Sequence, residues 1–334
     1  MKCLSEVRIL SQKEVASCLP MNKTIQAVED AYKAFANGRV AMPPVMHLDV
    51  SQYNGEVDIK SGYIEDFGLI GTKIASGYYE NHKLGLPPGV AVIVLMDLKT
   101  SMPVAIMDGS HITSFRTGAA GAVAAGVLAR KDSSTVGIVG AGTQGRMQII
   151  ALNELFSIKK IKVWDKVESA TNRYVKEMTS KLGISVEQCS SPKGVVEGAD
   201  IIVTVTPSKE ALVMNDWIKE GVHINAIGAD GPGKQELDPA IVKRADKIVV
   251  DSLSQCKIIG EIQHALKLGL IQEQDVHAEI GKILIGEKPG RESDNEITLF
   301  DSTGLAAQDI AAAHVVFEQA KERNIGHLVK LFDV

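Results

Sequence analysis

The sequence lacks the signals of several protein classes. Its four cysteines, Cys3, Cys18, Cys189 and Cys256, are widely separated and form no CxxC pair, so we expect reduced, packed thiols rather than a disulfide framework or a metal site. A net charge of −5 gives no reason to expect nucleic acid or an anionic membrane surface as a partner.

Signals for membrane insertion and export are also missing. The longest apolar run, residues 86–98, is too short to span a bilayer and contains two prolines and Asp97. Residues 1–6 lack the apolar core of a signal peptide. We therefore expect a cytoplasmic protein, and its 334 residues, 45% apolar and 23% charged, suit a globular chain of two domains.

What the sequence does contain is a glycine-rich turn between a predicted strand and a predicted helix. Gly140, Gly142 and Gly145 form a G-x-G-x-x-G pattern after the apolar residues 136–139. In this pattern the first glycine permits a tight turn, the second lets a pyrophosphate approach the backbone, and the third lets helix and strand pack closely. Asp165, twenty residues after Gly145, ends a second predicted strand, where a carboxylate accepts ribose hydroxyls. The order of these elements predicts a dinucleotide site.

After residue 133 the pattern alternates between strand and helix. Apolar strands are predicted at residues 136–140, 161–165, 201–206, 223–228, 247–251 and 297–300, and two intervening helices begin with an N-cap followed by proline, at Ser191 and Asp238. This alternation predicts a Rossmann-type, doubly wound parallel sheet over residues 126–304.

The first part of the chain has a different pattern. A capping box at residues 11–14 and an amphipathic run at 23–37 predict two helices, and the β-rich runs 47–50, 55–61, 69–76 and 90–98 predict a mostly antiparallel sheet. An alanine-rich helix is predicted at residues 114–130, and a last helix at about 304–324 is expected to return to this domain. We thus predict an α/β protein with a smaller β-rich α+β domain formed by residues 1–125 and 305–334.

Four further residues could carry chemistry, and each has a plainer interpretation. Lys73 lies in an apolar strand-like run, which by itself favours a lysine on the solvated face of a sheet. Arg116 near the start of the alanine-rich helix could hold a carboxylate or phosphate, or cap a loop. Asp230 follows a strand and could face a nicotinamide, or form an Asx-turn. Ser302 lies in the polar turn 300–304 (FDSTG) after the last strand, and this turn could complete that pocket or cap the last helix.

Taken together, four segments resemble the ornithine cyclodeaminase/μ-crystallin family, and within it the archaeal-type alanine dehydrogenases. These segments are residues 113–120 (TSFRTGAA), 140–145 (GAGTQG), 224–237 (INAIGADGPGKQEL) and 290–304, which contains GRESD and ITLFDSTG. The resemblance covers essentially the whole chain. It implies a homodimer joined through the β-rich domain, with the active site between the two domains of one subunit.

The resemblance also implies roles for individual residues. Lys73 matches the catalytic lysine of the family, Arg116 its anion-binding arginine, and Asp230 the aspartate that the cyclodeaminases place beside the nicotinamide. The basic residue that often follows the Pro-Pro-like turn is replaced here by Val45, so we expect Lys60 or His47 to supply a second cation for the substrate carboxylate, and Asp58 to meet an ammonium group.

The expected chemistry is hydride exchange at an α-amino carbon with NAD, because Asp165 should repel the 2′-phosphate of NADP, and no metal is required. The substrate would be an amino acid or a 2-oxo or imino acid, with alanine dehydrogenase as the leading activity. An ornithine cyclodeaminase with bound NAD and a non-catalytic ligand binder like the μ-crystallins are the alternatives. The predicted cofactor contacts are Arg116, Thr117, Gly140, Gly142, Thr143, Gln144, Gly145, Asp165, Lys166, Thr204, Thr206, Ala226, Gly228, Ala229, Asp230 and Ser302.

Overall fold

The computed structural model describes residues 6–333, which form two compact units. The first contains the described residues up to Arg116 and those from Leu305 onward, and the second is Thr117–Gly304. The boundary lies inside one helix, α3 (Ser110–Leu128), which begins earlier than the sequence suggested, so Arg116 lies in its second turn rather than at its start. The expectations about Cys3 and the first five residues lie outside the described part of the chain.

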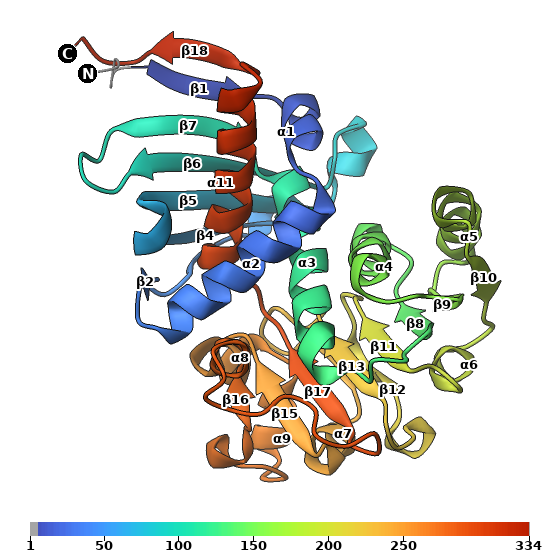
Figure 1. The fold of residues 1–334 in the computed structure, drawn as a ribbon. Helices are drawn as coiled ribbons and strands as arrows, with labels where there is room; N and C mark the ends of the chain where they lie inside the picture. Colours follow the sequence, from blue (N-terminus) through green and yellow to red (C-terminus); the bar gives the residue numbers. More distant parts are fainter. Residues whose placement is uncertain (1–5, 334) are drawn as a thin grey trace. The chain divides into compact units, whose positions relative to one another are not determined.

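The first unit is built on an eight-stranded sheet of order β18-β1-β7-β6-β5-β4-β2, with β3 also pairing to β4. Its long central strands are antiparallel, as predicted, whereas β1 runs parallel to β7. The strands are β1 (Glu6–Leu10), β2 (Val40–Ala41), β3 (Met46–Val50), β4 (Gly55–Ile64), β5 (Leu69–Tyr78), β6 (Gly89–Asp97), β7 (Pro103–Asp108) and β18 (His327–Lys330). The sequence did not predict β1, β2, β7 or β18. The first and last of these pair with each other, so both ends of the described chain lie side by side (Figure 1).

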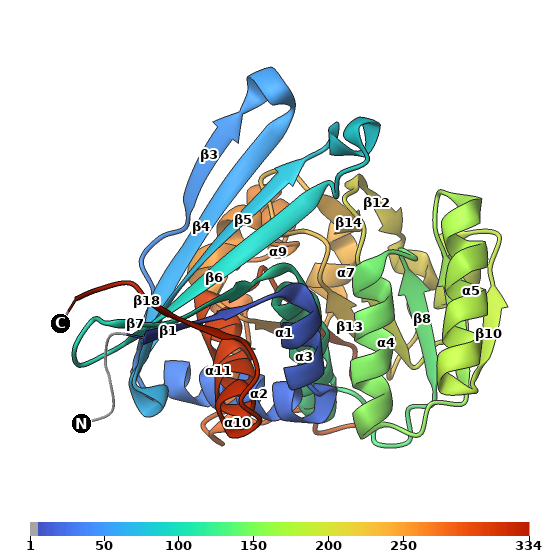
Figure 2. The ribbon, with the colours of Figure 1, turned by 90° about the horizontal axis from the view of Figure 1, so that it is seen from above.

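Three helices complete this unit: α1 (Gln12–Cys18), α2 (Met21–Ala36) and α11 (Ala306–Glu322). The predicted capping box begins α1, where the Glu14 carboxylate accepts from the Ser11 backbone N–H. Helices α2 and α11 lie across the sheet in Figure 1, and their alanines and aliphatic residues pack with Ile64, Ile93 and Leu95 in one core. The opposite face of the β3–β6 strands, which extend as long hairpins in Figure 2, carries exposed apolar side chains: Met46, Leu48, Ile74, Val90 and Val92.

The second unit contains an eight-stranded, fully parallel sheet of order β10-β9-β8-β11-β13-β17-β15-β16, which confirms the predicted doubly wound fold. Its strands are β8 (Thr135–Val139), β9 (Lys160–Trp164), β10 (Ser185–Gln188), β11 (Ile201–Thr204), β13 (His223–Ala226), β15 (Lys247–Val250), β16 (Ala278–Glu279) and β17 (Thr298–Asp301). The winding direction reverses at β8, and because such crossovers are right-handed the helices before and after the reversal cover opposite faces. Ligands of open parallel sheets bind at this reversal, beyond the carboxyl ends of the strands.

The connections of this unit comprise seven helices and a small ribbon. The helices are α4 (Thr143–Leu155), α5 (Glu168–Leu182), α6 (Pro192–Val196), α7 (Pro239–Arg244), α8 (Leu253–Ile259), α9 (Ile262–Lys267) and α10 (Ile280–Leu284). The predicted N-caps at Ser191 and Asp238 accept bonds from Gly194 and Ala240. Strands β12 (Lys209–Val213) and β14 (Gln235–Leu237) pair in parallel beside the main sheet (Figure 2).

Candidate active site and dinucleotide site

A buried lysine is the central feature of the first unit. Lys73, in the middle of β5, is only 3% exposed. Its Nζ atom lies 2.7 Å from Oδ2 and 2.8 Å from Oδ1 of Asp309, and it donates to Oγ1 of Thr113 at 3.3 Å. The interpretation of Lys73 as a side chain on the solvated face of the sheet is therefore wrong. Its ammonium group is held inside the protein by a carboxylate from α11.

A glycine lies where α11 packs closely on the sheet. A Cβ atom on Gly71 of β5 would lie 2.5 Å from the Cγ1 atom of Ile310, so a larger residue there would force the side chain or the helix to shift. The absence of a side chain at Gly71 thus helps α11 to pack at the distance at which Asp309 reaches Lys73.

Arg116 binds the same carboxylate from α3. Its Nε atom donates to Oδ1 of Asp309 at 3.0 Å, and its Nη1 atom donates to Oε1 of Gln308 at 2.8 Å. Gln308 in turn donates to the hydroxyl of Tyr32 on α2. Arg116 is 6% exposed, so three helices and one strand jointly fix two buried cations around one acid.

The cluster contains two basic side chains, Lys73 and Arg116, and one carboxylate, Asp309. Burial lowers the pKa of Lys73 to about 7, because the loss of hydration outweighs the attraction of Asp309, and the charges of Arg116 and Lys60 act in the same direction as burial. Burial opposes the ionisation of Asp309, yet Arg116 and Lys73 hold the pKa of that carboxyl below its usual range. A lysine whose pKa lies near 7 can donate or accept a proton at neutral pH.

The strand register places the predicted substrate residues on the same face of the sheet. Lys60 of β4 is directly opposite Lys73, and Asp58 is opposite Ala75 one step along the same face. His47 of β3 pairs with Asp58, and its Nδ1 atom lies 2.8 Å from Oδ1 of Asp58. That contact raises the pKa of the exposed His47. Lys60 is therefore the nearer of the two proposed second cations to Lys73.

The second unit contains the predicted glycine turn in the conformation that the motif requires. Gly140 has a φ of +113°, which favours glycine, and a Cβ atom on Gly145 would lie 2.3 Å from the carbonyl oxygen of Gly140. At Gly142, the N-cap of α4, an added Cβ atom would meet no heavy atom within 4 Å. The turn is thus tightly packed on its inner side and open at the position where a pyrophosphate would approach.

Three further observations fit a dinucleotide at this turn. The Oε1 atom of Gln144, in the first turn of α4, is buried and has no hydrogen-bond partner among the described residues. The carboxylate of Asp165 accepts from the backbone N–H groups of Ala141 and Val167, both at 2.8 Å, so it is fixed beside the turn. A cavity of about 580 Å³ adjoins it at the carboxyl ends of β9 and β10, lined by Trp164, Asp165, Lys166, Glu168, Thr171, Gln188, Cys189 and Ser190.

Thr117 lies in α3 and Thr143 begins α4, whereas the other predicted cofactor residues of this unit lie at or after the carboxyl ends of neighbouring strands. Thr204 ends β11 and Ala226 ends β13, and Thr206, Gly228 and Ala229 follow these strands. Asp230 is exposed and forms a 2.5 Å ion pair with Lys234. Ser302, after β17, donates to Asp251 at 2.9 Å, and because α11 begins at Ala306 with Leu305 as N-cap, Ser302 does not cap that helix.

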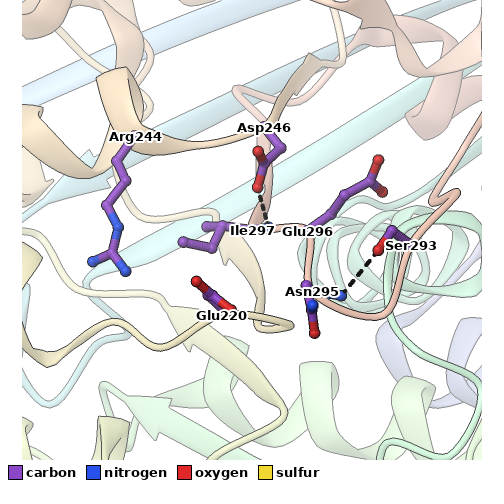
Figure 3. A pocket seen from close by; sticks show the side chains of 7 residues that line it. All are labelled: Glu220, Arg244, Asp246, Ser293, Asn295, Glu296 and Ile297. Carbon is purple, nitrogen blue, oxygen red and sulfur yellow. Dashed lines mark hydrogen bonds between the residues drawn. The ribbon is translucent and has the colours of Figure 1, made fainter.

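A second cavity of about 430 Å³ lies at the other edge of the parallel sheet (Figure 3). Its walls include Asp246, Ile297 and Glu220, which precede β15, β17 and β13 respectively. The cavity is therefore at the amino ends of these strands. Because ligands of open parallel sheets bind beyond the carboxyl ends, it is a poorer candidate for the cofactor site.

The sequence analysis missed Asp309 and Gln308. Both lie in the first turns of α11, within the segment 305–313 (LAAQDIAAA), whose other residues are all apolar. The available signal for a site was an acid and an amide in an otherwise apolar helical turn. An acid at the start of a helix is also explained by the positive end of the helix dipole, which it stabilises. Only the fold, which brings Asp309 to Lys73 across 236 residues, distinguishes the two possibilities.

The second unit is a Rossmann fold with a glycine turn, and the first contains a buried lysine. This combination is that of a dinucleotide-dependent enzyme. The chain belongs to the ornithine cyclodeaminase/mu-crystallin family, whose model matches residues 5–324. It is 44% identical to alanine dehydrogenase of Archaeoglobus fulgidus over 98% of this chain and 100% of that protein.

Solved structures agree with this assignment. An archaeal alanine dehydrogenase dimer with bound NAD, also 44% identical, has a TM-score of 0.93 over 98% of this chain and 100% of that chain. The Δ1-pyrroline-2-carboxylate reductase of Thermococcus litoralis, in complex with NADH and L-proline, is 38% identical with the same TM-score over 97% of this chain and 100% of that chain. The two relatives share the fold and differ in the amino or imino acid that their names give. None of the described helices is long and apolar enough to cross a membrane.

Proposed function

We propose that this protein is an NAD-dependent alanine dehydrogenase, which converts L-alanine, NAD⁺ and water to pyruvate, ammonium, NADH and a proton. The observation that carries the proposal is the buried cluster of Lys73, Asp309 and Arg116, with Lys60 opposite Lys73 on the sheet. The 44% identity to a named alanine dehydrogenase supports this choice of substrate over others in the family.

In the proposed reaction the cations act on the substrate. Arg116 and Lys60 bind the carboxylate, and together with Lys73 they exceed the single negative charge of Asp309, which favours an anionic ligand. Lys73, whose pKa burial lowers to about 7, exchanges the proton of the reacting amino or imino group. When bound, NAD would accept the hydride from the α-carbon. Asp230, in the role that the resemblance implies, would hold the ammonium group or a water molecule.

The cofactor is held, in this proposal, by the glycine turn and Asp165 of the second unit. The open position at Gly142 admits the pyrophosphate, and the start of α4 offers free N–H groups to it. The Asp165 carboxylate favours the ribose hydroxyls of NAD over the 2′-phosphate of NADP. We expect a kcat/KM for NADH above that for NADPH, and Asp165→Ser should narrow the difference. A preference for NADPH in the unchanged protein would contradict this assignment.

We further propose a homodimer. The exposed side chains of Met46, Leu48, Ile74, Val90 and Val92 share one face of the sheet, and contiguous apolar patches mark protein interfaces. The archaeal relative is described as a dimer, which supports a second copy of this chain as the partner.

A substrate panel monitored by NADH absorbance tests the function. Consumption of NADH with pyruvate plus ammonia, faster than with cyclic imines or other 2-oxo acids, is the expected result. Release of proline from ornithine without net change in NADH would instead identify a cyclodeaminase. Binding of NADH without turnover of any substrate would identify a ligand binder of the μ-crystallin kind.

A further inference from the structure

A buried carboxylate in the second unit holds two loops at once. Glu236, in β14, is completely buried, and its Oε1 atom accepts from the backbone N–H of Thr206 at 2.5 Å. Its Oε2 atom accepts from the N–H of Gly228 at 2.9 Å. Thr206 belongs to the loop after β11 and Gly228 to the loop after β13, so one side chain joins the carboxyl ends of two adjacent strands.

These loops border the glycine turn. A Cβ atom on Gly140 would lie 2.8 Å from the carbonyl oxygen of Val205 and 3.0 Å from Cγ2 of Thr206, so the loop after β11 is in direct contact with the turn. A Cβ atom on Gly228 would lie 2.4 Å from the carbonyl oxygen of Thr206, so the two loops also touch each other. A shift of either N–H group would therefore move the loops that pack against the glycine turn.

Glu236 is itself held in place by a second acid. The carboxylate of Glu261 accepts from the backbone N–H of Glu236 at 3.0 Å and from that of Leu237 at 2.7 Å. Burial raises the pKa of Glu236 to about 7, and burial, with the charge of Glu236, raises that of Glu261 well above its usual value. Asp301 faces Glu261 from β17, and Asp251 and Cys256 lie beside Asp301 in turn.

We propose that Glu236 is a positioning residue for the dinucleotide, because it fixes the loops after β11 and β13 against the glycine turn in the arrangement that binds the cofactor. This inference rests on the proposed function only in that the second unit must bind a nicotinamide dinucleotide. It assigns to Glu236 an action through the backbone of Thr206 and Gly228 rather than contact with the cofactor.

The test compares Glu236→Gln with Glu210→Gln, a control on the exposed neighbouring strand β12. A glutamine can accept only one of the two N–H groups, since its amide nitrogen is a donor. We expect the dissociation constant of NADH, measured by fluorescence, to rise at least about tenfold in Glu236→Gln and not in the control. The KM for NADH should rise in parallel, and kcat at saturating NADH should fall much less, whereas general damage to the fold would lower kcat as well.

The outcomes separate this inference from the proposed function. If the unchanged protein does not bind NADH, the proposed function fails. If the unchanged protein binds NADH and Glu236→Gln binds it equally well, only the role of Glu236 is refuted. Should Glu236→Gln not fold, hydrogen exchange in the unchanged protein decides: the amide of Thr206, which donates to the Glu236 carboxylate, should be protected without cofactor, and fast exchange there would overturn the proposal.

Discussion

The two units bury acidic side chains in opposite ways. In the first unit, Asp309 lies between Lys73 and Arg116, and these cations keep its pKa low. In the second unit, burial raises the pKa of both Glu236 and Asp301 to about 7, and the ion pairs of the described residues include none to these carboxyls. Backbone N–H groups lower the pKa of Glu236 and Asp301, but burial outweighs them, whereas the two cations beside Asp309 outweigh its burial and keep it charged at neutral pH.

The difference matches the ligand that each unit is proposed to hold. The first unit needs fixed positive charge for a carboxylate, and Asp309 keeps two cations in place without neutralising both. The second unit needs to accept a pyrophosphate, and because burial raises the pKa of Glu236 and Asp301 to about 7, these acids carry less negative charge at neutral pH than ordinary carboxyls would. Substitutions in the first unit should therefore change chemistry and charge, and those in the second should change cofactor binding.

The largest expected effect is that of Lys73→Met. If Lys73 exchanges the proton, its loss should lower kcat by roughly two to four orders of magnitude, the usual contribution of acid–base catalysis. The dissociation constant of NADH should stay unchanged, because the second unit is untouched. Steady-state kinetics with NADH fluorescence as the binding measurement test this, and Lys13→Met, at an exposed lysine of the same unit, is the matched control. A near-normal kcat would remove Lys73 from the mechanism.

The second prediction sets the two kinds of buried acid against each other. Asp309→Asn should lower the free energy of unfolding by about 3–5 kcal/mol, because it leaves two buried cations without their carboxylate. Asp301→Asn at pH 8 should leave that energy unchanged or raise it, because it removes a carboxyl that burial disfavours in its ionised form.

Urea denaturation at pH 8 and pH 5 measures the change in the free energy of unfolding for both variants. The pKa of Asp301 is raised on folding from 3.8 to about 7, so its contribution to stability is complete below pH 3.8 and is lost as the pH rises through about 7. The stabilising effect of Asp301→Asn should therefore shrink at pH 5. Destabilisation of similar size by both variants at pH 8 would show that the two environments do not differ as argued.

The third prediction concerns the pH dependence of catalysis. In the direction of imine reduction Lys73 must be protonated, so kcat should fall about tenfold per pH unit above about 7. Because the charge of Asp309 raises the pKa of Lys73, Asp309→Asn should move this limb to lower pH. The profile of Lys73→Met should lack the limb altogether. A limb that remains in that variant would belong to another group.

The same contrast explains what the sequence could predict. The glycine turn and the alternating strands and helices are local patterns, and the turn, the parallel sheet and the N-caps at Ser191 and Asp238 follow the prediction. The cation cluster depends on pairing between distant segments, and the pattern around Lys73 alone suggested a solvated lysine. The missed strands β1 and β18 pair across more than 300 residues, and each is only four or five residues long. Non-local contacts of this kind leave no periodic signal in either segment.

The smallest expected effects concern the second cation for the substrate carboxylate. Lys60→Met should raise the substrate KM about tenfold, the low end for loss of a charged hydrogen bond, because Lys60 is directly opposite Lys73 on the sheet. His47→Ala should change KM less than about twofold, because His47 is exposed and its Nδ1 atom is already bonded to Asp58.

The pH dependence of KM separates the two candidates. If Lys60 binds the carboxylate, KM should not rise across the pH range in which an imidazole loses its proton. If His47 binds it, KM should rise where the imidazole loses its proton, and because Asp58 raises the pKa of His47 that rise would begin above the usual value of 6.5. Should neither variant change KM, Arg116 alone binds the carboxylate. The positive charge of Lys60, which adds to the contrast between the first unit and the second, would then serve a purpose other than substrate binding.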